Sequence, residues 1–295
     1  MRCAGDGVGA LDGLPSHIPV ERDELARFKC EARVCLKLED AQGVMKQLFP
    51  SQDGLVLAEF NGHGQSRTEK HLKIFPLIRG MKRKVLICFD MDNTLILADR
   101  VHVAAYNQAF VKNGLSKVAP AVLKKKVGRL SRTLVQELFP RISAAKLKQV
   151  VADHDHLVVV DTKKYARVIP GVKPALRRLK KRYQLGLLTN CAHIEILPVL
   201  MAAGLDPGLF DVILGNDDVP RGKPWPDEIL KAKRLAHLKA AYMVGDTYFD
   251  ILAGKRAKAK TIGVLTGNQP KALLQRYKPD LILRSVADLP KALGC

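Results

Sequence analysis

The sequence lacks three features that would mark a membrane, secreted or disulfide-bonded protein. Its 295 residues contain no run of about eighteen apolar residues, so we expect no membrane-spanning helix. The first residues carry no apolar segment typical of a secretory signal, so we expect a cytoplasmic location. The six cysteines are scattered and form no CxxC pair, which favours reduced thiols over a disulfide framework.

Acidic residues are also scarce beside basic ones. The chain has 29 Asp and Glu against 49 Lys and Arg, which gives a net charge of +20. Residues 1–80 carry 11 of each sign, so the whole excess falls in residues 81–295. A basic surface attracts phosphoesters or nucleic acid, but it also simply keeps a protein solvated. The charge therefore leaves nucleic acid open as a partner without favouring it.

Residues 1–80 carry no motif that indicates chemistry. They are rich in glycine in places, and helices are expected near 21–34 and 39–48. Met81 opens a short basic segment that leads directly into an apolar run, and every motif described below follows it. We therefore hypothesise that residues 1–80 are an extension of unknown role that catalysis does not need, or an artefact of the assigned gene start.

From residue 84 onward, apolar runs alternate with helical patterns. The runs at 84–89, 185–189, 211–214, 241–245 and 261–265 predict short buried strands, and residues 281–283 predict an edge strand. Helices are expected between them, at 171–182, 193–203, 226–237 and 248–257. This alternation predicts an α/β fold with a Rossmann-like, doubly wound parallel sheet.

A long excursion separates the first two predicted strands. Residues 98–168 contain four amphipathic helical segments, at 101–113, 119–126, 131–138 and 143–155. A bare loop of this length is uncommon in a compact domain. We therefore expect an inserted α-helical cap domain above the active end of the sheet, and a core formed by residues 81–97 and 169–295.

The most informative residues are Asp90 and Asp92, which directly follow the first predicted strand. In an extended segment, residues i and i+2 point to the same side. Both carboxylates should therefore meet at the strand's carboxyl end, where open α/β sheets bind ligands. Like charges so close are tolerated when a cation lies between them or one carboxyl carries a proton. Either state suits a metal-assisted nucleophile beside an acid/base.

Polar residues also follow three later segments. Thr189 and Asn190 end one strand, Lys223 lies between a glycine and a proline before a helix, and Asp246 ends another strand with Asp250 four residues on. Taken singly these signals are weak, because such residues are common in turns, at helix caps and on surfaces. Capping, however, accounts for one of the last two carboxylates and not for both.

Taken in order, the motifs resemble those of the haloacid dehalogenase-like hydrolase superfamily: DxDxT, a strand ending in Thr or Ser, a Lys, and GDxxxD. The resemblance covers about residues 82–295 and is strongest to the phosphoglycolate phosphatase-like group, whose helical cap lies between the first two motifs. Asn93 stands where many members have Gly, an accepted variant.

The resemblance implies a role for each carboxylate of the core. Asp90 would attack phosphorus and form an aspartyl-phosphate. Asp92 would protonate the leaving group and then deprotonate the water, and it would bind Mg²⁺ through its backbone carbonyl. Asp246 would complete the Mg²⁺ site with Asp90 and Asp92.

The remaining motif residues would position the phosphoryl group. Thr189, the Asn190 amide and Lys223 would hold its oxygens, where positioning and charge neutralisation dominate catalysis. Asp250 would orient Lys223 or a metal-bound water. Thr94 is expected near the acid/base.

The cap should select the substrate. Residues 128–132 resemble the short cap loop that closes over the substrate in this group. Arg129 or Arg132 would then bind a carboxylate or a second phosphate, although solvated arginines fit the pattern equally well. We interpret the run His154-Asp155-His156 as helix surface, and His102 and His193 as structural or solvent-facing. No role is assigned to Cys191.

The leading function is a Mg²⁺-dependent phosphatase for a small phosphorylated metabolite such as 2-phosphoglycolate. Dehalogenases of the superfamily that the motifs resemble have no acid two residues after the nucleophile, so the resemblance implies phosphate chemistry rather than carbon–halogen cleavage. The alternatives are a nucleotide or nucleic-acid-end phosphatase, a sugar-phosphate mutase, and a non-catalytic basic binding module. The cap argues against polymers, and the intact motif set argues against a mere binding module. The oligomeric state stays open.

Overall fold

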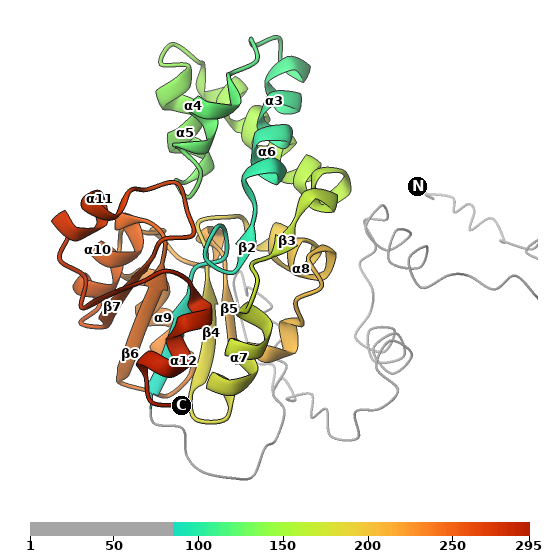
Figure 1. The fold of residues 1–295 in the computed structure, drawn as a ribbon. Coiled ribbons are helices and arrows are strands. Elements are labelled where there is room, and N and C mark those ends of the chain that lie inside the picture. Colours follow the sequence, from blue (N-terminus) through green and yellow to red (C-terminus); the bar gives the residue numbers. More distant parts are fainter. Residues whose placement is uncertain (1–84) are drawn as a thin grey trace, which may run out of the picture. The chain divides into compact units, whose positions relative to one another are not determined.

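Six parallel strands form the centre of the protein, as seen in a computed structural model that describes residues 85–295 (Figure 1). Their order across the sheet is β5-β4-β1-β6-β7-β8. The strands are β1 (Val85–Phe89), β4 (Gln184–Leu188), β5 (Val212–Leu214), β6 (Ala240–Gly245), β7 (Lys260–Val264) and β8 (Leu281–Leu283). The predicted α/β parallel sheet is therefore confirmed. The expectations for residues 1–80 lie outside the described residues.

Helices cover both faces of this sheet. Side chains alternate along each strand, so Leu86 and Cys88 pack on one face while Ile87 and Phe89 pack on the other. The first face carries α9 (Asp227–Leu235) and α10 (Tyr248–Arg256), and the second carries α7 (Val172–Lys180), α8 (His193–Ala202) and α12 (Leu289–Ala292). Burial on both faces explains why the strands read as continuous apolar runs.

Shorter elements complete the core. The helix α11 (Lys271–Arg276) packs against α10, and single 3-10 turns lie at η2 (Pro207–Leu209), η3 (Asn216–Asp218) and η4 (Val286–Asp288). Within the described part of the chain, none of the helices has the length and apolar character needed to cross a membrane.

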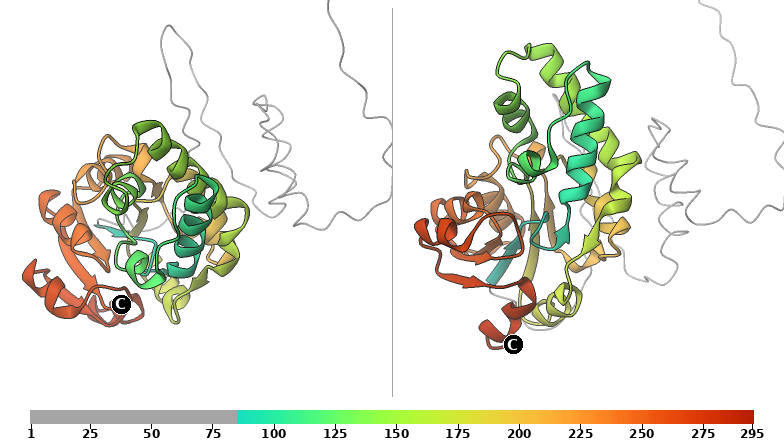
Figure 2. Two further views of the ribbon diagram at one scale, coloured as in Figure 1. Left: turned by 90° about the horizontal axis from the view of Figure 1, so that it is seen from above. Right: turned by 45° about the horizontal axis from the view of Figure 1, so that its top comes forward.

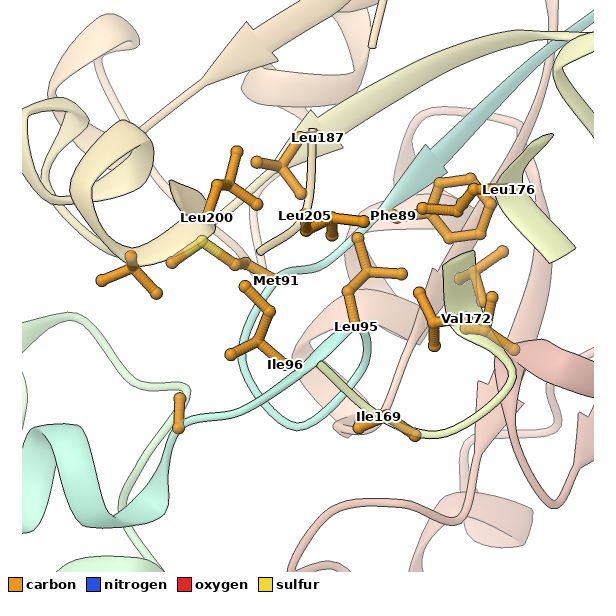
Figure 3. Packing of buried hydrophobic residues seen from close by; sticks show 14 of the residues in the cluster. Phe89, Met91, Leu95, Ile96, Ile169, Val172, Leu176, Leu187, Leu200 and Leu205 are labelled. Atoms are coloured by element: carbon orange, nitrogen blue, oxygen red, sulfur yellow. The ribbon is translucent and has the colours of Figure 1, made fainter. Parts of the chain in front are cut away.

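The loop after β1 is anchored by buried apolar side chains. Met91, Leu95 and Ile96 are fully buried and lie with Phe89 and Leu187 in one cluster (Figure 3). Burial of each such side chain contributes about 1.5–3 kcal/mol, so the loop is held firmly. Its two aspartates are thereby fixed at the end of the sheet.

The chain leaves the core through β2 (Ile96–Leu97) and returns through β3 (Arg167–Val168), and these two strands pair antiparallel. Between them lie α3 (Asp99–Lys112), α4 (Pro120–Lys124), α5 (Ser131–Leu138), α6 (Ala144–Val160) and the 3-10 turn η1 (Thr162–Tyr165). We call residues 98–168 the helical insertion. All four helices expected from the sequence are present, and α6 runs five residues further than expected.

The helical insertion has a hydrophobic cluster of its own. Tyr106, Phe110, Leu134 and Leu147 are among its buried members. Figures 1 and 2 show α3 to α6 together at one end of the sheet. The helix α6 also contacts α8 of the core, so side chains of the insertion reach the residues that follow β4.

Candidate active site

Three neighbouring strands bring the motif residues together. Because β4, β1 and β6 are adjacent in the sheet, Asp90, Thr189 and Asp246 follow strand ends that lie side by side. The backbone N–H of Asp90 donates to the carbonyl of Val244 at 2.9 Å, which continues the pairing of β1 with β6. Asp90, Thr189 and Asp246 are all buried.

Lys223 is fixed by three hydrogen bonds. Its Nζ donates to Asp90 Oδ1 at 2.6 Å, to Asp250 Oδ1 at 2.8 Å and to the Leu188 carbonyl at 2.9 Å. The side chain is only 2% exposed. Its three N–H groups are thus all used, and the ammonium group is directed at Asp90.

Asp250 serves two purposes at once. Its Oδ2 accepts hydrogen bonds from the backbone N–H and the hydroxyl of Thr247, at 3.1 and 2.7 Å, and so caps α10. Its Oδ1 faces Lys223. Capping therefore explains one oxygen of this carboxylate and the lysine explains the other.

The carboxylates at the strand ends crowd one another. Oxygens of Asp90, Asp246 and Asp250 lie within 4.8 Å of one another, and all three residues are buried. Burial, helped by the neighbouring carboxylates, raises the pKa of Asp90 to about 7. Burial and the charge of Asp90 raise the pKa of Asp246 well above its ordinary value. A bound cation would remove much of this cost.

The donor atoms fit a hard divalent cation. Oxygen is the only donor type among Asp90, Asp246 and Asp250, and Mg²⁺ prefers carboxylate and carbonyl oxygens. Gly267 leaves space beside the site, since a Cβ there would lie 1.7 Å from Asp246 Oδ2. Any larger residue would close this side of the carboxylate. The acidic cluster can therefore hold a divalent metal ion.

Thr94 lies beside Asp90 and Asp246 rather than beside Asp92. Its hydroxyl makes contacts of 3.1 Å to Asp90 Oδ2 and 3.3 Å to Asp246 Oδ1. The chain turns at Asn93, whose φ of 55° is left-handed and is tolerated better by Asn than by most residues. Because the chain turns here, Thr94 lies back at the end of β1, near Asp90 and Asp246.

Asp92 has a different set of neighbours. Its Oδ2 lies 3.1 Å from His102 Nε2 and accepts from the Cys191 thiol at 2.9 Å. Its Oδ1 is buried and has no hydrogen-bond partner among the described residues. Burial alone would raise the pKa of Asp92, but the charge and hydrogen bond of His102 outweigh burial and lower it. Asp92 in turn raises the pKa of His102 against the effect of burial.

The expectation that the run His154-Asp155-His156 is helix surface is wrong for His154. Its side chain is 1% exposed, whereas His156 is exposed. His154 Nε2 lies 3.2 Å from His102 Nδ1, and His154 Nδ1 lies 2.9 Å from Asp155 Oδ1. His154 is buried because it continues the buried stripe of α6 formed by Leu147, Val150 and Val158.

Two buried glutamates also escaped the sequence reasoning. Glu228 of α9 is fully buried near Lys223, and burial raises its pKa to about 7. Glu195 of α8 is fully buried 3.8 Å from His154 Nδ1. Burial, with Asp155 nearby, raises the pKa of Glu195 well above its usual range. An acidic residue on an apolar helix stripe was the available signal for both.

Asn190 ties the helical insertion to the core. Its Nδ2 donates to the Gly128 carbonyl at 2.9 Å and to the Lys223 carbonyl at 3.0 Å. Thr189 Oγ1 accepts from the backbone N–H of Cys191 at 3.2 Å. One side chain thus contacts both the loop before α5 and the segment that carries the lysine.

A small pocket lies between the helical insertion and the strand ends. Asp90, Asp92 and Thr189 line it from the core, and Tyr106 and Arg129 line it from the insertion. Its volume is about 20 Å³, which is room for a single water molecule. In this conformation the insertion closes the site.

Arg129 is already paired within the insertion. Its Nη1 donates to Glu137 Oε1 at 2.6 Å, and its guanidinium carbon lies 5.7 Å from the centre of the Phe249 ring. His193, expected to be structural or solvent-facing, is 45% exposed and pairs with Asp218 at 2.5 Å. The structure therefore joins Asp90, Asp92, Thr189, Asn190, Lys223, Asp246 and Asp250 in one site, with Arg129 on its wall.

A doubly wound parallel sheet with buried acidic groups at adjacent strand ends defines an α/β protein whose ligand site lies at the carboxyl edge of the sheet. Residues 87–264 match the family described as haloacid dehalogenase-like hydrolase, and the chain belongs to this family of hydrolases. The resemblance inferred from the motifs is confirmed.

Curated relatives of the chain include phosphatases from bacteria. The pyrophosphatase PpaX of Bacillus velezensis is 32% identical over 225 residues, which is 72% of this chain and 98% of the relative. The phosphoglycolate phosphatase of Yersinia pestis is 29% identical over 227 residues, which is 75% of this chain and 95% of the relative. The assignment to phosphoric monoester hydrolases agrees with the phosphoglycolate phosphatase.

Solved structures repeat the fold. A protein of Haemophilus somnus described as a predicted phosphoglycolate phosphatase aligns with a TM-score of 0.63 and 26% identity, and covers 72% of this chain and 100% of its own. A hydrolase of Pseudomonas syringae aligns with a TM-score of 0.62 and 24% identity. The alignment covers 72% of this chain and 98% of the hydrolase. The second likeness bears on the fold alone.

Proposed function

We propose that this protein is a Mg²⁺-dependent phosphatase that hydrolyses a small phosphomonoester resembling 2-phosphoglycolate through an aspartyl-phosphate on Asp90. The observation that supports this most is the contact of 2.6 Å between Lys223 Nζ and Asp90 Oδ1 inside a buried cluster of carboxylates. Such a lysine holds the nucleophile in place and offsets the charge of the incoming phosphoryl oxygens.

Each residue of the site then has a task. Asp90 attacks phosphorus, and Thr94 and Lys223 hold its two oxygens in the direction of attack. Thr189, the Asn190 amide and Lys223 bind the phosphoryl oxygens. The carboxylates of Asp90 and Asp246 and the backbone carbonyl of Asp92 would hold Mg²⁺, which neutralises phosphoryl charge when bound.

Asp92 is suited to moving the proton. Its Oδ2 is engaged by His102 and Cys191, and its Oδ1 has no partner among the residues that the structure describes. Once the carboxyl is protonated, the free oxygen can give that proton to the leaving alkoxide, and the resulting carboxylate can later take one from the attacking water. The two neighbours on Oδ2 keep the carboxylate from rotating away.

We further infer that residues 98–168 act as a cap on a core formed by residues 81–97 and 169–295. The pocket of about 20 Å³ has no room for a phosphoester, so the helical insertion must move before substrate binds. The chain crosses between the two parts only at β2 and β3, and this pair is the natural place for the motion. Arg129 would exchange Glu137 for an anionic group of the substrate.

A second candidate substrate is inorganic diphosphate. Relatives at up to 32% identity carry the name pyrophosphatase PpaX, and the same site chemistry would cleave a phosphoanhydride. A nucleotide or nucleic-acid-end phosphatase, a sugar-phosphate mutase and a basic binding module have no comparable support, although the mutase would share the nucleophile.

A substrate screen tests the proposal. Purified protein with Mg²⁺ is given 2-phosphoglycolate, diphosphate, nucleoside monophosphates, a hexose phosphate and a 5′-phosphorylated oligonucleotide, and phosphate release is measured. We expect the highest kcat/KM on 2-phosphoglycolate or a similarly small phosphoester, and loss of activity with EDTA. Preference for diphosphate would select the second candidate. Activity on no substrate, or full activity in EDTA, would contradict the proposal.

A further inference from the structure

The acid/base Asp92 lies in a cluster with His102 and Cys191, and phosphate transfer itself calls for neither an imidazole nor a thiol at this place. Asp92 Oδ2 lies 3.1 Å from His102 Nε2 and 2.9 Å from Cys191 Sγ, and the last two atoms lie 3.8 Å apart. All three residues are buried, and they come from the loop after β1, from α3 and from the loop after β4. A carboxylate, an imidazole and a thiol thus converge from three separate elements.

From this cluster we infer a second cation site, specific for a thiophilic divalent ion such as Zn²⁺ and distinct from the site for Mg²⁺. The inference that this ion inhibits the enzyme rests on the proposed function. The inference that the ion binds at this cluster is independent of the proposed function.

The spacing of the three donor atoms brings them within reach of a single ion. A triangle with sides of 2.9, 3.1 and 3.8 Å has a centre about 1.9 Å from every corner. Zinc takes distances of about 2.0–2.2 Å to O and N and about 2.3 Å to S. A tetrahedral ion therefore requires the Asp92–Cys191 contact to widen by about half an ångström, a shift that side-chain rotation can supply.

Donor type separates the two cation sites. The cluster of Asp90, Asp246 and Asp250 offers oxygen only, which suits Mg²⁺. The cluster of Asp92, His102 and Cys191 offers oxygen, nitrogen and sulfur, a set that selects zinc or a similar metal over magnesium. Excess Mg²⁺ should therefore fill the first site without competing for the second.

A water molecule could supply the fourth ligand of the ion. Asp92 Oδ1 is buried and has no hydrogen-bond partner among the described residues, and Asp92, His102 and Cys191 all line the pocket of about 20 Å³. The pocket has room for one water molecule, which would complete a tetrahedral site of three protein ligands and a water.

The histidine is oriented as a metal ligand usually is. A ligating imidazole generally donates its second N–H to a neighbouring acceptor, which fixes the ring and its tautomer. A proton on His154 Nδ1 satisfies Asp155, so His154 Nε2 accepts from His102 Nδ1 at 3.2 Å. His102 Nε2 then faces Asp92 and Cys191 and carries the second ring proton, which a metal ion would displace.

Binding balances in charge. The dication displaces one proton from Cys191 Sγ and one from His102 Nε2, and both protons go to solvent, so the net charge of the buried cluster is unchanged. The ion then occupies Asp92 Oδ2 and prevents this carboxylate from exchanging a proton with the leaving group. The expected effect is inhibition that added Mg²⁺ does not relieve.

The test titrates the full chain with Co²⁺ as a spectroscopic substitute for Zn²⁺, in saturating Mg²⁺ and without substrate. We expect a thiolate-to-cobalt charge-transfer band that saturates at about one ion per chain, as a mononuclear site requires. Cys191→Ser should remove the band, His102→Asn should weaken binding at least ~10-fold, and Cys295→Ser, the matched control, should keep it. A band that survives Cys191→Ser, or no band in the wild type, would overturn the site.

A second arm measures inhibition by Zn²⁺ of para-nitrophenyl phosphate hydrolysis, each variant relative to its own uninhibited rate. We expect Cys191→Ser to need at least ~10-fold more Zn²⁺ than Cys295→Ser for half inhibition. Equal sensitivity would refute the inhibitory role. A wild type that binds Co²⁺ but hydrolyses no phosphoester would instead refute the proposed function and leave the binding site standing.

Discussion

Asp90 and Asp92 lie two residues apart, but the fold surrounds each carboxylate with different groups. Asp90 faces Lys223 and Thr94, whereas Asp92 faces His102 and Cys191. The first environment holds an anion in line beside a cation, which suits a nucleophile. The second leaves one oxygen without a partner among the described residues, which suits a group that exchanges protons.

Lys223 depends on Asp250 for its position, which gives a prediction at the same scale. In Asp250→Asn the charged contact of 2.8 Å is lost, and the lysine is held by Asp90 and the Leu188 carbonyl alone. We expect kcat to fall ~10–100-fold with a smaller change in KM, as when a group that orients a site residue is removed.

Steady-state kinetics on para-nitrophenyl phosphate measures this effect. Asp227→Asn serves as the control, because Asp227 also lies in the first turn of a helix but pairs with Arg221 at the surface. An unchanged kcat in Asp250→Asn would show that Asp250 only caps α10.

At the scale of elements, the loop before α5 is expected to choose the substrate. Arg129 lines the pocket, while Arg132 is exposed and lies outside its lining. Arg129→Ala should raise KM about tenfold or more for a phosphoester that carries a carboxylate, because a charged hydrogen bond contributes about 1.5–3 kcal/mol. Para-nitrophenyl phosphate should be nearly unaffected.

Arg132→Ala is the matched control and should change neither KM. Equal effects of Arg129→Ala on both substrates would show that the pair formed by Arg129 and Glu137 is needed for the structure of the loop and does not read the substrate.

The packing of α3 on α6 gives a prediction about pH. Asp153 of α6 accepts from Lys112 and Asn113 at the end of α3, both at 2.7 Å. Burial alone would raise the pKa of Asp153, but these hydrogen bonds and one from Gln149 lower it. A carboxyl whose pKa is lower in the folded state stabilises the protein above its unfolded pKa of about 3.9, and this stability is lost as the pH falls through the folded pKa.

Urea unfolding from pH 7 to pH 3 tests this. Asp153→Asn should lower the free energy of unfolding by about 1 kcal/mol at pH 7, since Lys112 is largely open to solvent, and the difference from wild type should shrink on acidification. Asp288→Asn, a change at a more exposed aspartate, is the control. A difference that is constant with pH would contradict the assignment.

At the scale of the whole molecule, the sequence was sufficient for what depends on short segments. Each core strand is an apolar run, and the polar residues that follow β1, β4 and β6 lie at the carboxyl edge, so the site at Asp90, Asp92 and Asp246 could be predicted together with the fold. The strands β2 and β3 were missed because two residues carry no periodic pattern.

Contacts between distant elements could not be predicted in this way. His102 and His154 are 52 residues apart, and Cys191 and His102 are 89 apart. Their meeting depends on how the helical insertion packs on the loop after β4, which no local pattern specifies. A histidine on an apolar helix stripe was the one visible sign, and it reads equally well as an ordinary core residue.

The central claim is that Asp90 is the nucleophile and Asp92 the acid/base, and rapid quench with a radiolabelled phosphoester followed by mass mapping tests it most directly. The wild type should carry label on Asp90 alone, and Asp90→Asn should carry none and show no turnover. Asp92→Asn should still form some labelled Asp90 with a good leaving group but lose it slowly, with turnover down ~10²–10⁴-fold. Label on another residue, or none in a wild type that turns over, would contradict the account.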